Sequence, residues 1–232
     1  MNVCIIPARG GSKRIPKKNI KTFLGQPIIA YSIQTAIHSC CFDKVIVSTD
    51  DAEISAISNN YGAITPFVRP RELSGDYTPT IPVIKHAINW LEENEVYPDN
   101  VCCIYPTAPF LKSETIKNSL NIFEKNNYDY CFGVTNFNYP IQRALLIDEK
   151  NRVSMLDSKM YNRRSQDLVD AYHDIGQFYW GKANSFKSEL PMFNVNSIGY
   201  KVESYLVNDI DTIDDWKRAE IMYQYLKDLK EI

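Results

Sequence analysis

A dense group of cations follows the first apolar run of this chain and could bind a polyphosphate. Directly after residues 3–6, five basic residues lie within ten positions: Arg9, Lys13, Arg14, Lys17 and Lys18. Gly10, Gly11 and Ser12 add little side-chain bulk, so backbone N–H groups there can approach an anion closely. Arginine can also bind two phosphate oxygens at once. Because the whole chain has a net charge of −2, this cation density is local, and we interpret the loop as a phosphate site.

The alternative for this basic loop is an ordinary solvated surface. We favour the phosphate site because the cations follow a buried-looking strand, and ligands of open α/β sheets bind at the carboxyl ends of strands. The glycine spacing matches neither the Walker A loop nor the dinucleotide fingerprint.

A pair of carboxylates near the end of the chain could bind a divalent cation. Asp209 and Asp211 are two positions apart, so in an extended segment their side chains point the same way. Such a pair leaves room for water and phosphate oxygens, which Mg²⁺ prefers as ligands. The alternative is a helix start, with Thr212 as N-cap and Asp215 completing a capping box. Both can hold together, and beside the basic loop the pair indicates nucleotide chemistry.

A third polar segment spans residues 67–80. It combines Arg69, Arg71, Glu72 and Asp76 with several hydroxyl groups, and it follows a predicted strand. It would therefore lie at the same edge of the sheet as the basic loop. Its chemistry suits a nucleobase site and a plain polar loop equally well.

Composition narrows the class of protein. The chain has 232 residues, of which 44% are hydrophobic, enough for one large domain with a packed core. Its 26 basic and 28 acidic residues give no overall field for nucleic acid or an anionic membrane. We see no signal-peptide core and no membrane span, and we expect a cytoplasmic protein. No zinc-like spacing joins the six cysteines, so we expect reduced, mostly structural thiols.

Strand-like and helix-like segments alternate through the first 135 residues. Apolar runs predict strands at 3–6, 44–48, 63–67, 101–105 and 130–135. Helical patterns predict helices at 52–61, closed by Gly62, around 84–91, at 113–126 with Ser113 as N-cap, and at 213–229. The alternation predicts an α/β fold with three layers and a largely parallel sheet, in a single domain of residues 1–232.

The pattern breaks between about residues 136 and 175. That stretch is polar and irregular, with short strand candidates near Leu145 and Val153. We interpret it as an excursion from the sheet that contacts substrate or pairs subunits, and the alternative is a flexible surface loop. Strands are predicted again at 177–180 and 205–208.

Several segments, in this order and spacing, resemble the cytidylyltransferases that activate nine-carbon acidic sugars, the relatives of CMP-sialic acid synthetase (acylneuraminate cytidylyltransferases). The resemblance covers almost the full chain. Its segments are ARGGSKRIPKKN at 8–19, IVSTDD at 46–51, RPRELSGD at 69–76, YPTAPF at 105–110 and DIDT at 209–212. The resemblance implies a Rossmann-like nucleotidyltransferase fold, CTP as donor, Mg²⁺ as cofactor and a homodimer formed by the excursion.

The resemblance also implies roles for residues at matching positions. The nucleotide site would comprise Ala8, Arg9, Gly11, Ser12, Lys13, Lys18, Asn19, Arg69 and Thr80. Among these, Arg9, Lys13 and Lys18 would carry the catalysis. Asp209 and Asp211 would bind Mg²⁺.

The acceptor sugar is indicated by departures from the sialic acid enzymes. Tyr105 stands where those enzymes usually carry glutamine, and the segments 165–168 and 172–181 resemble the pseudaminic acid cytidylyltransferases. Pseudaminic acid ends in a methyl group, which an aromatic pocket accepts with little desolvation cost. The residues implied to contact the sugar are Tyr105, Arg163, Arg164, Gln166, Asp167, Tyr172, His173 and Gln177.

The implied reaction is attack of the sugar's anomeric hydroxyl on the α-phosphorus of CTP, with release of pyrophosphate. The CMP-sugar would serve flagellin glycosylation or a surface polysaccharide. No general base is evident, since His173 could orient substrate or simply brace its loop. Alternative acceptors are sialic and legionaminic acid. A different class, a nucleotide-binding module without catalysis, is disfavoured because binding alone needs no metal aligned on the reacting phosphate.

Overall fold

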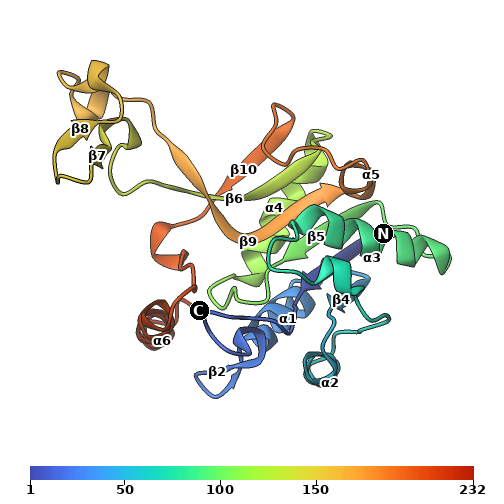
Figure 1. Cartoon of the computed structure of the whole chain (residues 1–232). Helices are drawn as coiled ribbons and strands as arrows, with labels where there is room; N and C mark the ends of the chain where they lie inside the picture. The colour runs from blue at the N-terminus through green and yellow to red at the C-terminus, as the bar shows by residue number, and fades with distance from the viewer.

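The computed structural model describes residues 1–232 and has a six-stranded sheet at its centre (Figure 1). The strand order is β10-β6-β9-β5-β1-β4. The bounds are β1 Asn2–Pro7, β4 Lys44–Ser48, β5 Asn100–Ile104, β6 Tyr130–Asn136, β9 Tyr172–Lys182 and β10 Ser197–Lys201. β1 pairs in parallel with β4 and β5, β10 pairs in parallel with β6, and β9 runs antiparallel to β5 and β6. The predicted α/β fold with a mostly parallel sheet is confirmed.

Helices cover both faces of the sheet and make three layers. Successive residues of β1 alternate between the two cores: Cys4 and Ile6 pack on one side, and Val3 and Ile5 on the other. The first side carries α1 Ile28–His38, α2 Ala52–Asn60, α4 Ser113–Lys125 and α6 Ile213–Asp228. The second side carries α3 Thr80–Glu93 and α5 Ala183–Lys187. Because both faces are buried, the central strands read as continuous apolar runs.

Local patterns place most of these elements correctly. The predicted apolar face of α3 is buried in full, at Ile84, Ala87, Ile88 and Leu91. Gly62 follows α2 with a φ of +93°, a left-handed conformation that favours glycine. The six cysteines are free, as predicted, and burial raises the pKa of the Cys4, Cys102, Cys103 and Cys131 thiols. No helix is both long and apolar enough to cross a bilayer.

Three predictions about elements are wrong. Within residues 63–67 only Ile64 forms an isolated bridge, to Ile46 of β4, and residues 205–208 overlap a 3₁₀ turn, Ser204–Leu206, where a strand was expected. The edge strand is instead β10, whose half-exposed residues lack an apolar run. Ser113 is the first helical residue of α4 and not its N-cap, since its hydroxyl donates to the carbonyl of Thr35 at 3.1 Å.

Other elements have no counterpart in the prediction. These are helix α1, helix α5, and the small hairpin of β2 Thr22–Phe23 and β3 Gln26–Pro27. Short 3₁₀ turns lie at Lys18–Ile20, Arg71–Leu73, Ile141–Arg143, Ser158–Met160 and Ser165–Asp167.

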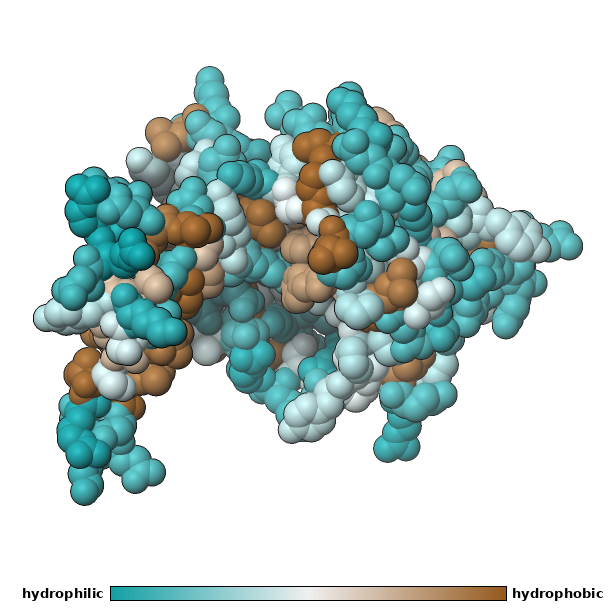
Figure 2. Space-filling model, turned by 90° about the horizontal axis from the view of Figure 1, so that it is seen from above, coloured by the Kyte–Doolittle hydropathy of each residue, from teal (hydrophilic) through white to brown (hydrophobic).

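The excursion projects from the sheet as a separate lobe, at the upper left of Figure 1. Its antiparallel hairpin joins β7 Leu145–Ile147 to β8 Val153–Met155, which confirms the strand candidates near Leu145 and Val153. β9 begins at Tyr172, so residues 172–175 belong to the sheet and not to the excursion. The hairpin leaves Leu145, Ile147 and Val153 more than half exposed. Figure 2 shows apolar side chains gathered on this lobe.

Candidate functional site

A polar cleft of about 480 Å³ opens where β1 and β5 end. The basic loop after β1, the start of α3 and the segment after β5 each contribute to its wall. The predicted site residues that line it are Arg9, Ser12, Lys18, Asn19, Arg69, Thr80 and Tyr105. This position agrees with the rule that ligands of α/β sheets bind at the carboxyl ends of strands.

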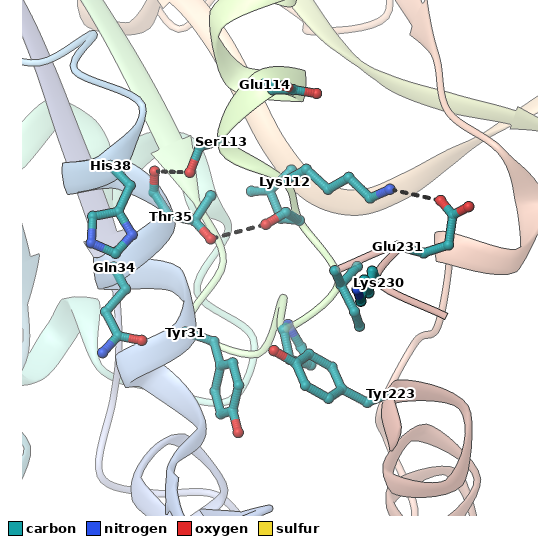
Figure 3. Close-up of a pocket in the computed structure, with 13 residues that line it drawn as sticks. Tyr31, Gln34, Thr35, His38, Lys112, Ser113, Glu114, Tyr223, Lys230 and Glu231 are labelled. Carbon is teal, nitrogen blue, oxygen red and sulfur yellow. Dashed lines mark hydrogen bonds and ion pairs between the residues drawn. The ribbon is translucent and has the colours of Figure 1, made fainter. Parts of the chain in front are cut away.

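A second cavity, of about 560 Å³, lies elsewhere, between α1, the segment before α4 and the end of the chain (Figure 3). None of the predicted site residues lines it. Two polar contacts lie within it: the Thr35 hydroxyl donates to the Leu111 carbonyl at 2.9 Å, and Lys112 pairs with Glu231 at 3.6 Å. Because the predicted cations line the first cleft and not this cavity, we assign the site to the first cleft.

The basic loop is braced by Asp50, just after β4, a role that the sequence does not predict. The Gly10 N–H donates to Asp50 Oδ1 at 3.0 Å, and the Ser12 N–H donates to the Gly10 carbonyl at 3.0 Å. A side chain at Gly10 would come within 2.6 Å of Asp51, so only glycine fits there. The N–H groups of Gly10 and Ser12, which were expected to face an anion, are therefore already hydrogen-bonded to the protein. The lysine and arginine side chains remain to bind an anion.

Two predicted phosphate-binding cations share one carboxylate. Arg9 donates to Asp76 Oδ1 at 2.8 Å, and Lys13 forms an ion pair with the other oxygen of Asp76. These contacts, that of Lys13 most, lower the pKa of Asp76. Lys17 differs, because it pairs with Glu53 on α2 and neither residue lines the cleft. A ligand carrying several negative charges could replace Asp76 at Arg9 and Lys13.

Arg69 is a buried cation with no acidic partner within ion-pair distance. Only 4% of it is exposed, and it donates to both the hydroxyl and the carbonyl oxygen of Ser48. Burial lowers its pKa to about 10, so it stays charged at neutral pH. Asn19 is also buried, and its side chain donates to the Arg9 carbonyl at 2.9 Å. Both side chains hold backbone of the cleft wall in place.

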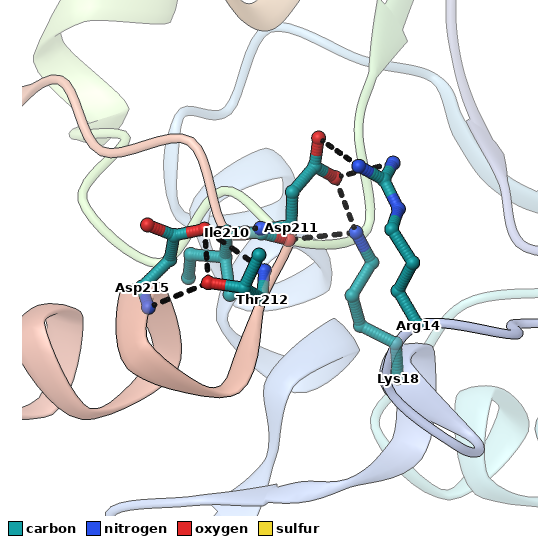
Figure 4. Close-up of polar contacts among 6 residues, drawn as sticks. All are labelled: Arg14, Lys18, Ile210, Asp211, Thr212 and Asp215. Carbon is teal, nitrogen blue, oxygen red and sulfur yellow. Dashed lines mark hydrogen bonds and ion pairs between the residues drawn. The ribbon is translucent and has the colours of Figure 1, made fainter.

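In the segment before α6, Asp211 meets two cations that line the cleft, Arg14 and Lys18 (Figure 4). Both terminal nitrogens of Arg14 donate to the Asp211 carboxylate, at 2.8 and 2.9 Å. Lys18 donates to the Ile210 carbonyl at 2.7 Å and to Asp211 at 3.3 Å. The predicted capping box is confirmed: Thr212 accepts from the Asp215 N–H at 3.2 Å, and Asp215 accepts from the Thr212 N–H at 2.8 Å.

Asp209 and Asp211 fit a metal ion whose other ligands are oxygen atoms of phosphate or water. Burial raises the pKa of Asp209, and the neighbouring charge of Asp211 raises it further, so a cation would stabilise the ionised form. No cluster of three or more potential His, Cys, Asp or Glu ligands occurs. An ion here needs oxygen ligands from phosphate or water, which is the usual situation of Mg²⁺ in phosphoryl-transfer sites.

The predicted sugar residues fall into separate places. At the cleft, the Tyr105 hydroxyl is 2.8 Å from the Thr80 hydroxyl, and its ring lies 5.4 Å from that of Tyr179. Burial raises the pKa of Tyr105 to about 12. Tyr179 donates to Asp174 at 2.5 Å, a contact that the sequence analysis did not foresee. Gln177 is buried and donates to the Leu206 carbonyl at 2.9 Å, so it ties β9 to the 3₁₀ turn Ser204–Leu206.

The remaining predicted sugar residues do not line the cleft of their own chain. Lys201 donates to the Tyr172 hydroxyl at 2.6 Å, and His173 lies 2.9 Å from the Asp174 carbonyl. Arg163, Arg164, Gln166 and Asp167 are on the projecting lobe, where Arg164 and Asp167 form a two-pronged ion pair at 2.8 and 3.0 Å.

Comparisons with known proteins agree with this geometry. The family model for cytidylyltransferases matches residues 3–231. The chain is 48% identical over 224 residues to the pseudaminic acid cytidylyltransferase of Campylobacter jejuni, covering 96% of both chains. It is 31% identical over 225 residues to the N-acylneuraminate cytidylyltransferase of Escherichia coli, covering 96% of this chain and 52% of that one. The resemblance seen in the motifs is confirmed.

A solved structure gives the same answer for the fold. The structure of CMP:2-keto-3-deoxy-manno-octonic acid synthetase complexed with CTP superposes with a TM-score of 0.72, at 16% identity, over 97% of this chain and 99% of that one. The nucleotidyltransferase fold is therefore confirmed independently of sequence similarity. The family model matches residues 3–231, and a cationic cleft lies at the expected edge of the sheet. This chain therefore belongs to the cytidylyltransferase family.

Proposed function

We propose that this enzyme transfers CMP from CTP to the anomeric hydroxyl of pseudaminic acid and releases pyrophosphate. The observation that carries the choice of acceptor is the 48% identity, over 96% of both chains, to the Campylobacter jejuni pseudaminic acid cytidylyltransferase. The donor is supported by the cleft itself, which gathers cations at the sheet edge where nucleotides bind in this kind of fold.

The donor side of the cleft divides into a phosphate region and a base region. Arg9, Lys13 and Lys18, with Gly11 and Ser12, would hold the triphosphate. Asn19, Arg69 and Thr80 would form the cytidine pocket together with backbone near Ala8. The buried charge of Arg69 supports this division, because an unpaired cation beside a cleft is stabilised by a carbonyl oxygen or an anion of the ligand.

The reaction is an in-line substitution at phosphorus. The anomeric oxygen of the sugar forms a bond to the α-phosphorus of CTP, the bond to the β-phosphate oxygen breaks, and the hydroxyl proton is released. The basic loop would align the triphosphate and neutralise the charge that develops on the leaving pyrophosphate. Asp209 and Asp211 would hold Mg²⁺, which supplies further neutralisation of phosphate charge when bound.

The acceptor side would combine residues from two chains. Tyr105, Tyr172 and His173 come from β9 and the end of β5, and the buried Gln177 would position β9 through its bond to Leu206. Arg163, Arg164, Gln166 and Asp167 lie on a lobe that projects away from its own cleft. The exposed apolar hairpin of that lobe needs a partner, which supports a homodimer in which each lobe reaches the other subunit. An arginine of the lobe, Arg163 or Arg164, would then bind the sugar carboxylate.

Availability of the donor places the enzyme in the cell. Because CTP is made in the cytoplasm, we place this enzyme there. Its CMP-sugar would supply flagellin glycosylation or a surface polysaccharide.

The test is pyrophosphate release from CTP and Mg²⁺ with pseudaminic, sialic and legionaminic acid offered separately. Release with pseudaminic acid alone supports the proposal. Release with another of these sugars would keep the reaction and overturn the acceptor, and CTP binding without release from any of them would favour a binding module. The metal is tested by adding EDTA and by Asp211→Asn, each of which should abolish release.

A further inference from the structure

We propose that Arg14 shields Asp211 when no nucleotide is bound, so that Arg14 and the metal ion compete for the same carboxylate. The inference rests on the Mg²⁺ site proposed above and assigns a role to a cation that the proposed function leaves without one. In this role Arg14 is a positioning residue, since it acts through Asp211.

The geometry leaves neither oxygen of Asp211 unoccupied. Arg14 Nη1 donates to Oδ2 at 2.8 Å, and Arg14 Nη2 donates to Oδ1 at 2.9 Å. Lys18 adds a third contact, at 3.3 Å to Oδ1. Figure 4 shows the two side chains reaching Asp211 from the basic loop. An ion bound through this face of the carboxylate must displace the Arg14 guanidinium.

The two members of the carboxylate pair differ in this respect. Asp211 pairs with Arg14 and Lys18, whereas Asp209 forms no ion pair. The free chain therefore presents one shielded and one unshielded carboxylate. Mg²⁺ in such sites is held by one or two carboxylates together with phosphate oxygens, so shielding of Asp211 halves the carboxylates open to the ion.

The position of Arg14 also allows it to release Asp211 when the nucleotide binds. Its side chain is 67% exposed and lines the cleft, so its ion pair is weakly held and easily exchanged. Lys18 is anchored differently, because it also donates to the backbone carbonyl of Ile210. A phosphate group offers a guanidinium the same two-pronged contact that Asp211 provides. Exchange of Arg14 from Asp211 to the triphosphate would expose the carboxylate as the metal–nucleotide complex enters.

The test measures Mn²⁺ binding to the nucleotide-free enzyme by the electron paramagnetic resonance signal of free Mn²⁺. Arg14→Ala should bind Mn²⁺ about two- to fivefold more tightly than wild type, the range expected for loss of an exposed ion pair. The matched control is Lys17→Ala, which removes one positive charge from the same loop but whose partner is Glu53, outside the cleft. The control should bind as wild type does. Adding Asp211→Asn to Arg14→Ala should remove the gain.

A second measurement follows Arg14 to the nucleotide. CTP titrated in EDTA should bind Arg14→Ala more weakly than it binds Lys17→Ala, because only Arg14 gains a phosphate contact. Equal Mn²⁺ affinity in Arg14→Ala and Lys17→Ala would overturn the shielding. The proposed metal site would still stand in that case if Asp211→Asn abolishes the response of turnover to Mg²⁺. Unchanged Mg²⁺ dependence in Asp211→Asn would instead overturn the metal site of the proposed function, and this inference with it.

Discussion

At the scale of single residues, two cations at or near the cleft carry charges that add little to the stability of the fold. Arg69 is buried without an acid, and Lys13 stands 80% exposed beside Asp76. Burial of a charge, as at Arg69, costs free energy of folding. An exposed ion pair, as at Lys13, contributes little to the free energy of folding. Such residues are better explained by a ligand than by stability. Their variants should therefore change CTP affinity more than the melting temperature.

Arg69→Met should weaken CTP binding by about tenfold or more, since charged hydrogen bonds of this kind contribute roughly 1.5–3 kcal/mol. Its thermal unfolding midpoint should stay within about 4 °C of wild type, because the variant removes a buried charge and fills similar volume. The pKa of Arg69 is lowered on folding, so its charged form is a cost at every pH below about 10, and that cost is lost only as the pH rises further. Isothermal titration and a thermal melt check both expectations.

The exposed neighbour Arg71, which does not line the cleft, provides the control for this variant. Arg71→Met should bind CTP as wild type does. Equal loss of CTP affinity in the two variants would argue against a cytidine pocket at Arg69.

Lys13→Ala should lower kcat/KM for CTP by about 10²–10³ while leaving the melting temperature unchanged. Its side chain is 80% exposed and pairs with Asp76 at the surface, so its removal disturbs little packing. Steady-state pyrophosphate release gives the rate, with Lys17→Ala as the charge-matched control. A rate close to that of the control would remove Lys13 from the catalytic cations.

At the scale of elements, the site depends on how each segment ends. β1 ends at the basic loop, Asp50 after β4 braces this loop, and α6 begins two residues after Asp211. The capping box of α6 does two jobs, because Asp215 also accepts a hydrogen bond from the Asp211 N–H at 3.3 Å. The start of this helix therefore fixes the backbone of a candidate metal ligand.

Asp215→Ala should lower the melting temperature by about 2–4 °C, as expected for loss of an N-terminal cap in a chain of this size. It should also raise the Mg²⁺ concentration needed for half-maximal rate, since the segment that carries Asp211 loses an anchor. Asp214→Ala is the control, because it removes the same charge from the same turn without breaking the cap. The capping contacts lower the pKa of Asp215, so its contribution holds at neutral pH and is lost only as the pH falls through that lowered value.

At the scale of the whole molecule, the lobe has no evident purpose within a single chain. Its hairpin is exposed and apolar, and its arginines are remote from the cleft that they are proposed to serve. A second copy would solve both problems by covering the apolar residues and receiving the polar ones.

Ile147→Asp should convert the enzyme to a monomer and abolish transfer to the sugar while preserving CTP binding. Light scattering after size exclusion gives the mass, and CTP-induced thermal stabilisation reports the donor site. Val195→Asp is a matched control, since Val195 is fully exposed outside the lobe and its variant should keep the mass of wild type. A mass that is the same for wild type and Ile147→Asp would argue against the lobe as the dimer surface.

The sequence by itself determined the layers, the basic loop and the cap of α6. Apolar runs and helical spacing report burial over a few residues, and the capping box needs only Thr212 and Asp215, three positions apart. These signals are local, so no knowledge of the remaining chain was needed to read them. The edge strand β10 escaped because an exposed edge has little apolar signal.

Only the tertiary structure decided which charges meet. Arg14 and Asp211 are 197 positions apart, and Arg9 and Asp76 are 67 apart, yet each pair forms hydrogen bonds. The first pairing needs α6 to pack beside the start of the chain, where Trp216 contacts Phe23, and the second needs β1 to lie between β4 and β5. Strand order depends on how all the helices pack on two faces, a property of the whole chain that no short segment encodes.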